Sequence, residues 1–110
     1  MLPYQYQPDP ALQAEAEKAQ AGREYVIRCQ RIGDDYRGSL DCIKILTPVE
    51  RGPIRAIDNG AAEEEVIYID GVPVATFVTW YGSGGSSWKR AAQVIRPLGK
   101  TRIEWEWPED

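Results

Sequence analysis

Cys29 and Cys42 are the two residues whose type and spacing bear most directly on chemistry. The segment between them is symmetric, because Gly33 and Gly38 are equally distant from its centre. An antiparallel hairpin with that centre places the two cysteines opposite each other, at a separation that a cross-strand disulfide can bridge. Two interpretations follow: a stabilising or redox-sensitive disulfide, or two reduced thiols that pack as small hydrophobic side chains.

Aromatic residues flank a Gly/Ser loop at residues 82–87. Tyr81 and Trp88 stand at the two ends of this loop, where exposed rings offer a flat platform for stacking a sugar or a nucleobase. Carbohydrate contact at these residues is one interpretation, and packing in the core is the other. On the last predicted strand, Trp105 and Trp107 alternate with charged residues. We expect both tryptophans to be buried, and the glutamates beside them to be exposed.

The chain contains no histidine. This absence removes the Ser-His-acid and Cys-His nucleophile systems, together with nearly every zinc or non-haem iron site. The acidic run Glu63-Glu64-Glu65 does not have the spacing of a calcium-binding EF-hand and is interpreted as a solvated edge. We therefore expect a protein that is not an enzyme and that holds neither a cofactor nor a metal.

Charge and hydropathy restrict the partners. The formal net charge is −4, and the thirteen Lys and Arg residues are scattered, which argues against nucleic acid as a partner. No apolar run approaches the roughly 18 residues of a membrane-spanning helix, and the N-terminus shows no signal-peptide pattern. These features predict a protein in the cytoplasm, or in a particle assembled there, whose partners are other proteins or further copies of itself.

Strand patterns dominate the chain from residue 23 onward, and they predict a single antiparallel β-sandwich over residues 23–110. The clearest is a hairpin in which Val66–Ile69 and Val72–Tyr81 flank the turn dipeptide Asp70-Gly71. Further strands are predicted over residues 25–32, 40–48, 88–96 and 103–107. Residues 51–60 contain two turn-forming dipeptides and are predicted to be a long connection.

Residues 1–22 are predicted to form an arm followed by one short helix. Asp9 is the expected N-cap and Pro10 the first residue of a helix that ends at Ala21. The apolar face of this helix is thin, consisting of Leu12, Ala16 and Ala19. Such a helix either lies loosely on the surface or is covered by a partner. We expect this segment to carry the assembly contacts, made by Leu2, Tyr4, Tyr6 and Leu12.

Two short motifs carry a resemblance to known proteins. Residues 68–74 fit the pattern Y-x-D-G-x-x-V, and residues 97–103 fit P-x-G-x-x-x-I. From Ile43 onward the chain therefore resembles immunoglobulin-like sandwich modules, in particular bacterial Ig-like repeats. A weaker similarity, over Ile43–Leu46 and Thr101–Trp105, is to SoxZ, the Ig-like partner of the sulfur carrier in thiosulfate oxidation.

The resemblance implies an Ig-like β-sandwich, which is a fold whose function usually lies in its surface. We expect a non-enzymatic interaction or structural subunit of a larger assembly, such as an accessory or decoration component of a viral particle. Two alternatives remain open: a SoxZ-like partner of a sulfur carrier, and a carbohydrate-binding module.

Overall fold

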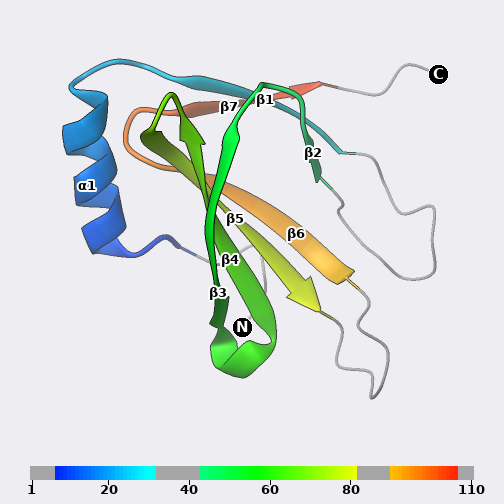
Figure 1. The fold of residues 1–110 in the computed structure, drawn as a ribbon. Coiled ribbons are helices and arrows are strands. Elements are labelled where there is room, and N and C mark those ends of the chain that lie inside the picture. The colour runs from blue at the N-terminus through cyan, green and yellow to red at the C-terminus, as the bar shows by residue number, and fades with distance from the viewer. Residues whose placement is uncertain (1–6, 32–42, 82–89, 107–110) are drawn as a thin grey trace.

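The computed structural model describes residues 7–31, 43–81 and 90–106 and contains two β-sheets and one helix (Figure 1). The elements in chain order are α1 (Pro10–Gln20), β1 (Val26–Arg31), β2 (Ile43–Ile45), β3 (Glu50–Ile57), β4 (Ala62–Ile69), β5 (Val72–Tyr81), β6 (Arg90–Pro97) and β7 (Arg102–Glu106). A short 3-10 turn at Asp58–Gly60 joins β3 to β4. The predicted fold class, mainly β with two sheets and one short helix, is confirmed.

Four consecutive strands form one sheet, in the order β3-β4-β5-β6 with antiparallel neighbours. The other sheet has the order β2-β1-β7, and in it β1 and β7 run parallel. The prediction of an antiparallel sandwich is therefore wrong for this pair, because β7 joins the three-stranded sheet and runs beside β1 in the same direction. The described strand order also differs from the ABED/CFG division of an immunoglobulin constant domain, so the resemblance rests on sequence motifs.

The hairpin between β4 and β5 forms as predicted. Asp70 and Gly71 both have positive φ, at 51° and 78°, and the strands on either side pair Ile69 with Val72. Two central residues with positive φ define the type I′ turn, whose twist matches that of the flanking strands. This part of the fold is determined by local sequence alone.

Residues 51–60 are not the long connection that was predicted, because most of them belong to β3. Gly52 and Pro53 are accommodated by a shift of register between Arg51 and Ile54 on this edge strand. Edge strands and bulges are the places in a sheet that tolerate proline. At Gly52 a Cβ atom would lie 2.4 Å from the Tyr68 ring, so the glycine gives that ring its room.

The main core lies between the two sheets. Ile27 and Cys29 of β1 are fully buried and belong to one cluster with Ile67, Phe77 and Ile95 of the larger sheet. A second, smaller cluster contains Ala62, Val78 and Trp80. The cross-strand register shows that these three side chains lie on one face of the larger sheet and that Phe77 lies on the opposite face. Both faces of the larger sheet are therefore partly buried.

Helix α1 begins as predicted, with the Asp9 carboxylate accepting a hydrogen bond from Ala11 N at 2.8 Å. Its buried residues, however, are Ala16 and Gln20, whereas Ala19 is exposed and Leu12 is half-buried. The predicted apolar face is therefore wrong at Ala19, and the helix depends on a polar residue for its attachment to the sheets.

Gln20 attaches α1 to the sheets through its side-chain amide. The two Nε2 protons are shared among three acceptors, the carbonyls of Pro73 and Leu98 and Thr101 Oγ1, at 3.1, 2.9 and 3.1 Å, while Oε1 accepts from Lys100 N at 2.9 Å. Because its polar atoms are paired in this way, Gln20 can be buried to 1% exposure. The helix is thus neither loose on the surface nor dependent on a partner to cover Gln20.

Candidate functional site

A groove of about 500 Å³ lies between β6, an edge of the larger sheet, and β7, an edge of the smaller one. Residues 94–97 of β6 line one side of this β6/β7 groove, and residues 101–103 with Trp105 line the other. Successive residues of a strand point to opposite faces, so a wall made of consecutive residues is the edge of the strand, backbone included. The groove is therefore bounded by two strand edges that meet at the turn joining β6 to β7.

The edge of β7 offers backbone donors and acceptors to the groove. Arg102 N donates to Tyr25 O at 2.8 Å, so the backbone polar groups of Arg102 point toward β1. Polar groups along a strand point to its two edges alternately, which directs the N–H and C=O groups of Ile103 and Trp105 away from β1. Among the described strands β1 is the only one that pairs with β7, and so these four groups face the groove.

The edge of β6 offers fewer groups. Leu98 N donates to Val74 O at 2.9 Å, and the same alternation turns the amide of Ile95 toward the groove. Pro97 occupies the next position of that edge and has no N–H, which is how proline is tolerated on an edge strand. Of the two edges, β7 is therefore the better template for a further strand.

Trp105 lies on this groove and is 40% exposed, which contradicts the prediction that it is buried. Its side chain shares a face of β7 with the half-buried Ile103, as the alternation predicted, but the larger sheet does not close over it. The Arg31 guanidinium lies over the ring, with Cζ 4.5 Å from the centroid, within the range of a cation–π contact. Trp107 lies outside the described residues.

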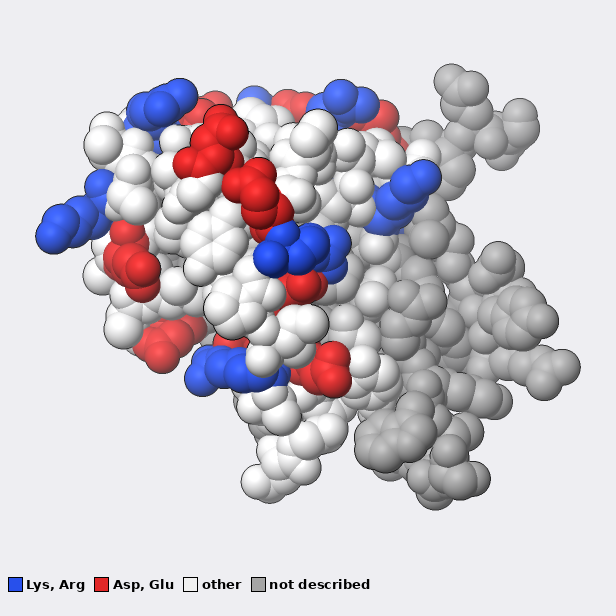
Figure 2. Space-filling model, in the orientation of Figure 1, with Lys and Arg blue, Asp and Glu red and all other residues white. Residues whose placement is uncertain are grey.

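Arginine dominates the charge of the groove. Its described lining contains Arg31, Arg96 and Arg102, and no Asp or Glu. Arg102 is paired with Glu104 at 3.2 Å and with Glu24 at 3.7 Å. The chain as a whole has a net charge of −4, and acidic and basic side chains are interspersed on the face in Figure 2. Among the described residues, the groove lining thus differs from this mixed surface in containing arginine as its only charged residue type.

Sequence reasoning did not identify Arg31 or Arg96 as site residues. Arg31 is the last residue but one of the strand predicted over residues 25–32, and Arg96 precedes the predicted turn at Pro97, so each is at a position where a solvated charge is ordinary. Arg31 ends β1, and Trp105 lies on β7. These two residues can be recognised as parts of one site only when β1 and β7 are known to be neighbouring strands.

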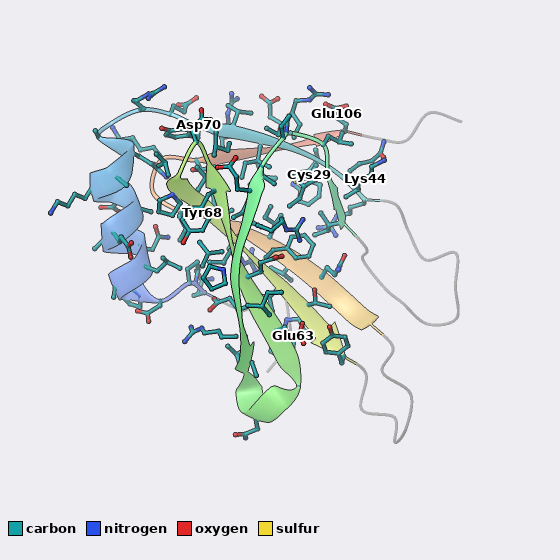
Figure 3. The ribbon with its side chains drawn as sticks, viewed as in Figure 1. Cys29, Lys44, Glu63, Tyr68, Asp70 and Glu106 are labelled. Atoms are coloured by element: carbon teal, nitrogen blue, oxygen red, sulfur yellow. The ribbon has the colours of Figure 1, made fainter. Side chains whose placement is uncertain are left out.

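The predicted pairing of Cys29 with Cys42 is not the register observed. Cys29 lies opposite Ile45, three residues beyond the predicted partner, while Cys42 lies outside the described residues. Cys29 is a buried free thiol on the inner face of β1 (Figure 3). Burial raises the pKa of this thiol to about 11, although the positive charge of Arg31 works in the other direction. The geometry is that of a packed, unreactive thiol.

The other predicted contact residues are not brought together in the described part of the chain. Leu12 is half-buried on α1, and Tyr81, at the far end of β5, donates its hydroxyl to Glu63 Oε2 at 3.2 Å. The remaining predicted contacts, Leu2, Tyr4, Tyr6 and Trp88, lie outside the described residues. A platform at Tyr81 and Trp88 therefore stays a prediction.

The acidic run at residues 63–65 is not a uniformly solvated edge. Glu63 is exposed near the start of β4, at the opposite end of that strand from Asp70 (Figure 3), whereas the Glu64 side chain is only 2% exposed. Glu64 Oε1 accepts from Arg55 Nε at 2.7 Å, and Oε2 is buried with no hydrogen-bond partner in the structure. Burial raises the pKa of the Glu64 carboxyl.

Two unpartnered polar atoms lie on the same face of the larger sheet as Glu64, namely Thr76 Oγ1 and Trp80 Nε1. Within the described ranges, no group of three His, Cys, Asp or Glu side chains is arranged to hold a metal ion. In the same ranges, no helix combines the length and apolar character needed to cross a membrane.

Comparison with protein-family models, with curated proteins and with solved structures finds no match to this chain. The β6/β7 groove is thus characterised by its own described geometry: two strand edges, the exposed Trp105 and three arginines in the lining.

Proposed function

We propose that this chain is a non-enzymatic interaction module of a larger assembly and that it docks its partner in the β6/β7 groove. The observation that carries the proposal is Trp105, a large aromatic residue left 40% exposed beside the Arg31 guanidinium. Tryptophan and arginine are the side chains most enriched at the energetic centres of protein interfaces. An accessory subunit, in the cytoplasm or in a particle such as a virion, fits this role.

The groove is a better docking surface than the N-terminal helix that the sequence favoured. The buried side chains of α1, Ala16 and Gln20, pack within the fold, and the polar atoms of Gln20 bond to the sheet and to the turn after β6. A surface already used inside the fold is not available to a partner. The predicted contacts at residues 1–6 lie outside the described chain and remain a separate proposal.

The proposal is tested by purifying tagged wild-type chain and tagged variants from the native host. Trp105→Ala removes the exposed ring, and Arg28→Gln is the matched control, since Arg28 is exposed on the outer face of β1 and pairs with Glu106. We expect a stoichiometric partner, or a self-associated form, to persist with Arg28→Gln and to be lost with Trp105→Ala. Unchanged association of Trp105→Ala would refute docking in this groove.

A carbohydrate-binding module is a second candidate, because an exposed ring is also a surface on which a sugar can stack. The exposure of Trp105 supports a stacking surface in the β6/β7 groove, in addition to the platform predicted at Tyr81 and Trp88. Titration with cellohexaose, followed by tryptophan fluorescence, separates the two functions. Saturable binding that Trp105→Ala abolishes would favour the carbohydrate function.

A further inference from the structure

We infer that the chain also forms a dimer, in which the outer edge of β3 pairs with the same edge of a second copy and joins the two larger sheets into one. This surface is distinct from the proposed docking groove, because β3 and β6 are the two opposite edges of the larger sheet (Figure 1). The inference is carried by the backbone of β3, by the exposure of Ile54 and by a register that is symmetric about this residue.

A row of backbone groups on β3 points away from β4. Tyr81 N donates to Ala61 O at 3.0 Å, so the polar groups of Ala61, and of every second residue from there to Ile67, point toward β5. Opposite residues of an antiparallel pair exchange two hydrogen bonds or none, so the β3 residues opposite these positions direct their N–H and C=O groups outward. These residues, the β3 edge row, are Arg51, Ile54 and Ala56. Among the described strands, β4 alone pairs with β3.

Ile54 is the most exposed large hydrophobic side chain of the described residues, at 60%. Edge strands that stay unpaired commonly carry a charged residue, a proline or a bulge. The bulge at Gly52 and Pro53 does not interrupt the edge row, because neither residue belongs to it and the missing N–H of Pro53 is not one of its donors. An apolar side chain therefore stands at the centre of an edge whose backbone donors remain in place.

An antiparallel pair centred on Ile54 matches the edge row with itself. Ile54 lies opposite Ile54 of the second copy, and Arg51 lies opposite Ala56 at each end, because the bulge adds a residue without altering the spacing of the row. Each opposite pair exchanges two hydrogen bonds, and the two Ile54 side chains cover each other on one face. An open edge also accepts a strand of another protein, but a row that is complementary to itself favours a second copy.

No like charges lie opposite each other in this pairing. Arg51 is paired with Glu65 of its own chain at 2.6 Å and lies opposite the small, uncharged Ala56 of the second copy. Arg55 is paired with Glu64 at 2.7 Å and lies opposite the bulge of the second copy. A register centred on Arg55 would instead place two arginines directly opposite each other, which is destabilising. The charges therefore favour the register centred on the isoleucine.

Sedimentation velocity of the full chain, over concentrations from about 5 to 500 µM, tests the inference. A pairing of two short edges is a small interface, so we expect a monomer–dimer equilibrium with a Kd of roughly 10–100 µM. Ile54→Asp opposes two carboxylates at the centre and removes the apolar contact, and it is expected to weaken the dimer at least about tenfold. The control, Lys44→Asp, adds the same carboxylate to β2, an edge strand of the smaller sheet, and is expected to stay within about twofold of wild type.

Two further measurements test the register. Ile54→Asp and Ile54→Lys chains, each expected to be monomeric alone, are expected to associate when mixed, because the register places the two substituted positions opposite each other. Restored association also shows that both variants are folded. Amide exchange at Ile54 and Ala56 is expected to slow at high protein concentration, whereas the N–H of Arg55, which points toward β4, is expected to be unaffected.

The inference is overturned if the wild-type chain remains monomeric over the whole range, or if Ile54→Asp, folded by circular dichroism, dimerises as wild type does. It is also overturned if the mixed Ile54→Asp and Ile54→Lys chains do not associate, or if the dimer forms without slower exchange at Ile54 and Ala56.

The dimer and the proposed docking function fail separately. A β3 dimer is a self-associated form that Trp105→Ala leaves intact, so the co-purification experiment is carried out in the Ile54→Asp background as well. Loss of a partner with Trp105→Ala in that background supports the groove whether or not the β3 dimer forms.

Discussion

The side-chain amide of Gln20 donates a hydrogen bond to the main-chain carbonyl of Leu98 at 2.9 Å, across 78 positions of sequence. Gln20 ends α1, and Leu98 stands in the turn between β6 and β7. The two edges of the β6/β7 groove diverge from this turn, and Thr101 within it is both a groove residue and a second acceptor for Gln20. The helix is thus hydrogen-bonded to the turn that joins the two strands of the proposed docking groove.

The first prediction concerns this attachment. Gln20→Ala removes the amide that donates to Pro73 O, Leu98 O and Thr101 Oγ1 and that accepts from Lys100 N, and it is expected to lower the free energy of unfolding by about 1–3 kcal/mol. Glu15→Ala, at an exposed position of the same helix, is the control and is expected to stay within about 0.5 kcal/mol of wild type. Urea unfolding measures both, and equal stabilities of the two variants would show that the Gln20 contacts do not hold the helix.

The second prediction concerns pH and Glu64. Burial raises the pKa of this carboxyl, so the folded state retains the proton to higher pH than the unfolded chain does. The folded state then binds more protons, and the contribution of Glu64 to stability falls as the pH rises from the usual carboxyl range toward the raised value. Glu64→Gln removes this dependence and is therefore expected to gain stability relative to wild type between pH 4 and pH 7.

The control for Glu64 is Glu63→Gln, which removes a charge from the exposed neighbouring position. Urea midpoints at pH 4, 5.5 and 7 compare the two variants. If the urea midpoints of Glu64→Gln and Glu63→Gln differ from that of wild type by the same amount at every pH, burial of Glu64 has no electrostatic effect on stability and this prediction is wrong.

The third prediction concerns Cys29. A thiol whose pKa is about 11 instead of 9.0 has roughly a hundredfold less reactive thiolate at pH 8, and burial blocks the reagent as well. In a Cys42→Ser background, Ellman's reagent is expected to label Cys29 at least about a hundredfold more slowly in the native protein than in guanidinium chloride. Similar rates in the two conditions would mean that Cys29 is accessible.

The fourth prediction compares two tryptophans within the chain. Trp80 is 6% exposed and Trp105 is 40% exposed. Trp80→Ala is expected to cost about 3–5 kcal/mol of unfolding free energy, and Trp105→Ala about 1–2 kcal/mol, because less buried area is lost. Denaturant unfolding of the two variants decides the matter. An equal cost would show that Trp105 is a core residue and would remove the strongest reason for placing a docking site beside it.

Sequence predicted the parts of this fold that depend on neighbours in the chain. The type I′ hairpin at Asp70-Gly71, the N-cap at Asp9 and the turn after Pro97 each follow from residues a few positions apart, and each is present. The strand at Glu50–Ile57 was missed because Gly52 and Pro53 are turn formers by composition, and only their place on a bulged edge makes them compatible with a strand.

The candidate site could not be predicted in the same way, because it depends on contacts between distant segments. The exposure of Trp105 follows from the gap between β6 and β7, which no pattern within β7 encodes. In the sequence, Gln20 is typical of a solvated helix residue. Its burial depends on the carbonyls of Pro73 and Leu98, which accept hydrogen bonds from its amide only in the folded chain. The register of Cys29 was inferred from the symmetry of two glycines, whereas the structure pairs Cys29 with Ile45.

Amide hydrogen exchange at Ile103 and Trp105 tests the central claim most directly. The N–H groups of these residues face the groove, whereas those of Arg102 and Glu104 point toward β1 and serve as internal controls. With a saturating concentration of the partner recovered by co-purification, exchange measured by NMR is expected to slow at least about tenfold at Ile103 and Trp105, and to change little at the two controls. Unchanged exchange at Ile103 and Trp105 in the saturated sample, or equal slowing at all four positions, would contradict docking in the β6/β7 groove.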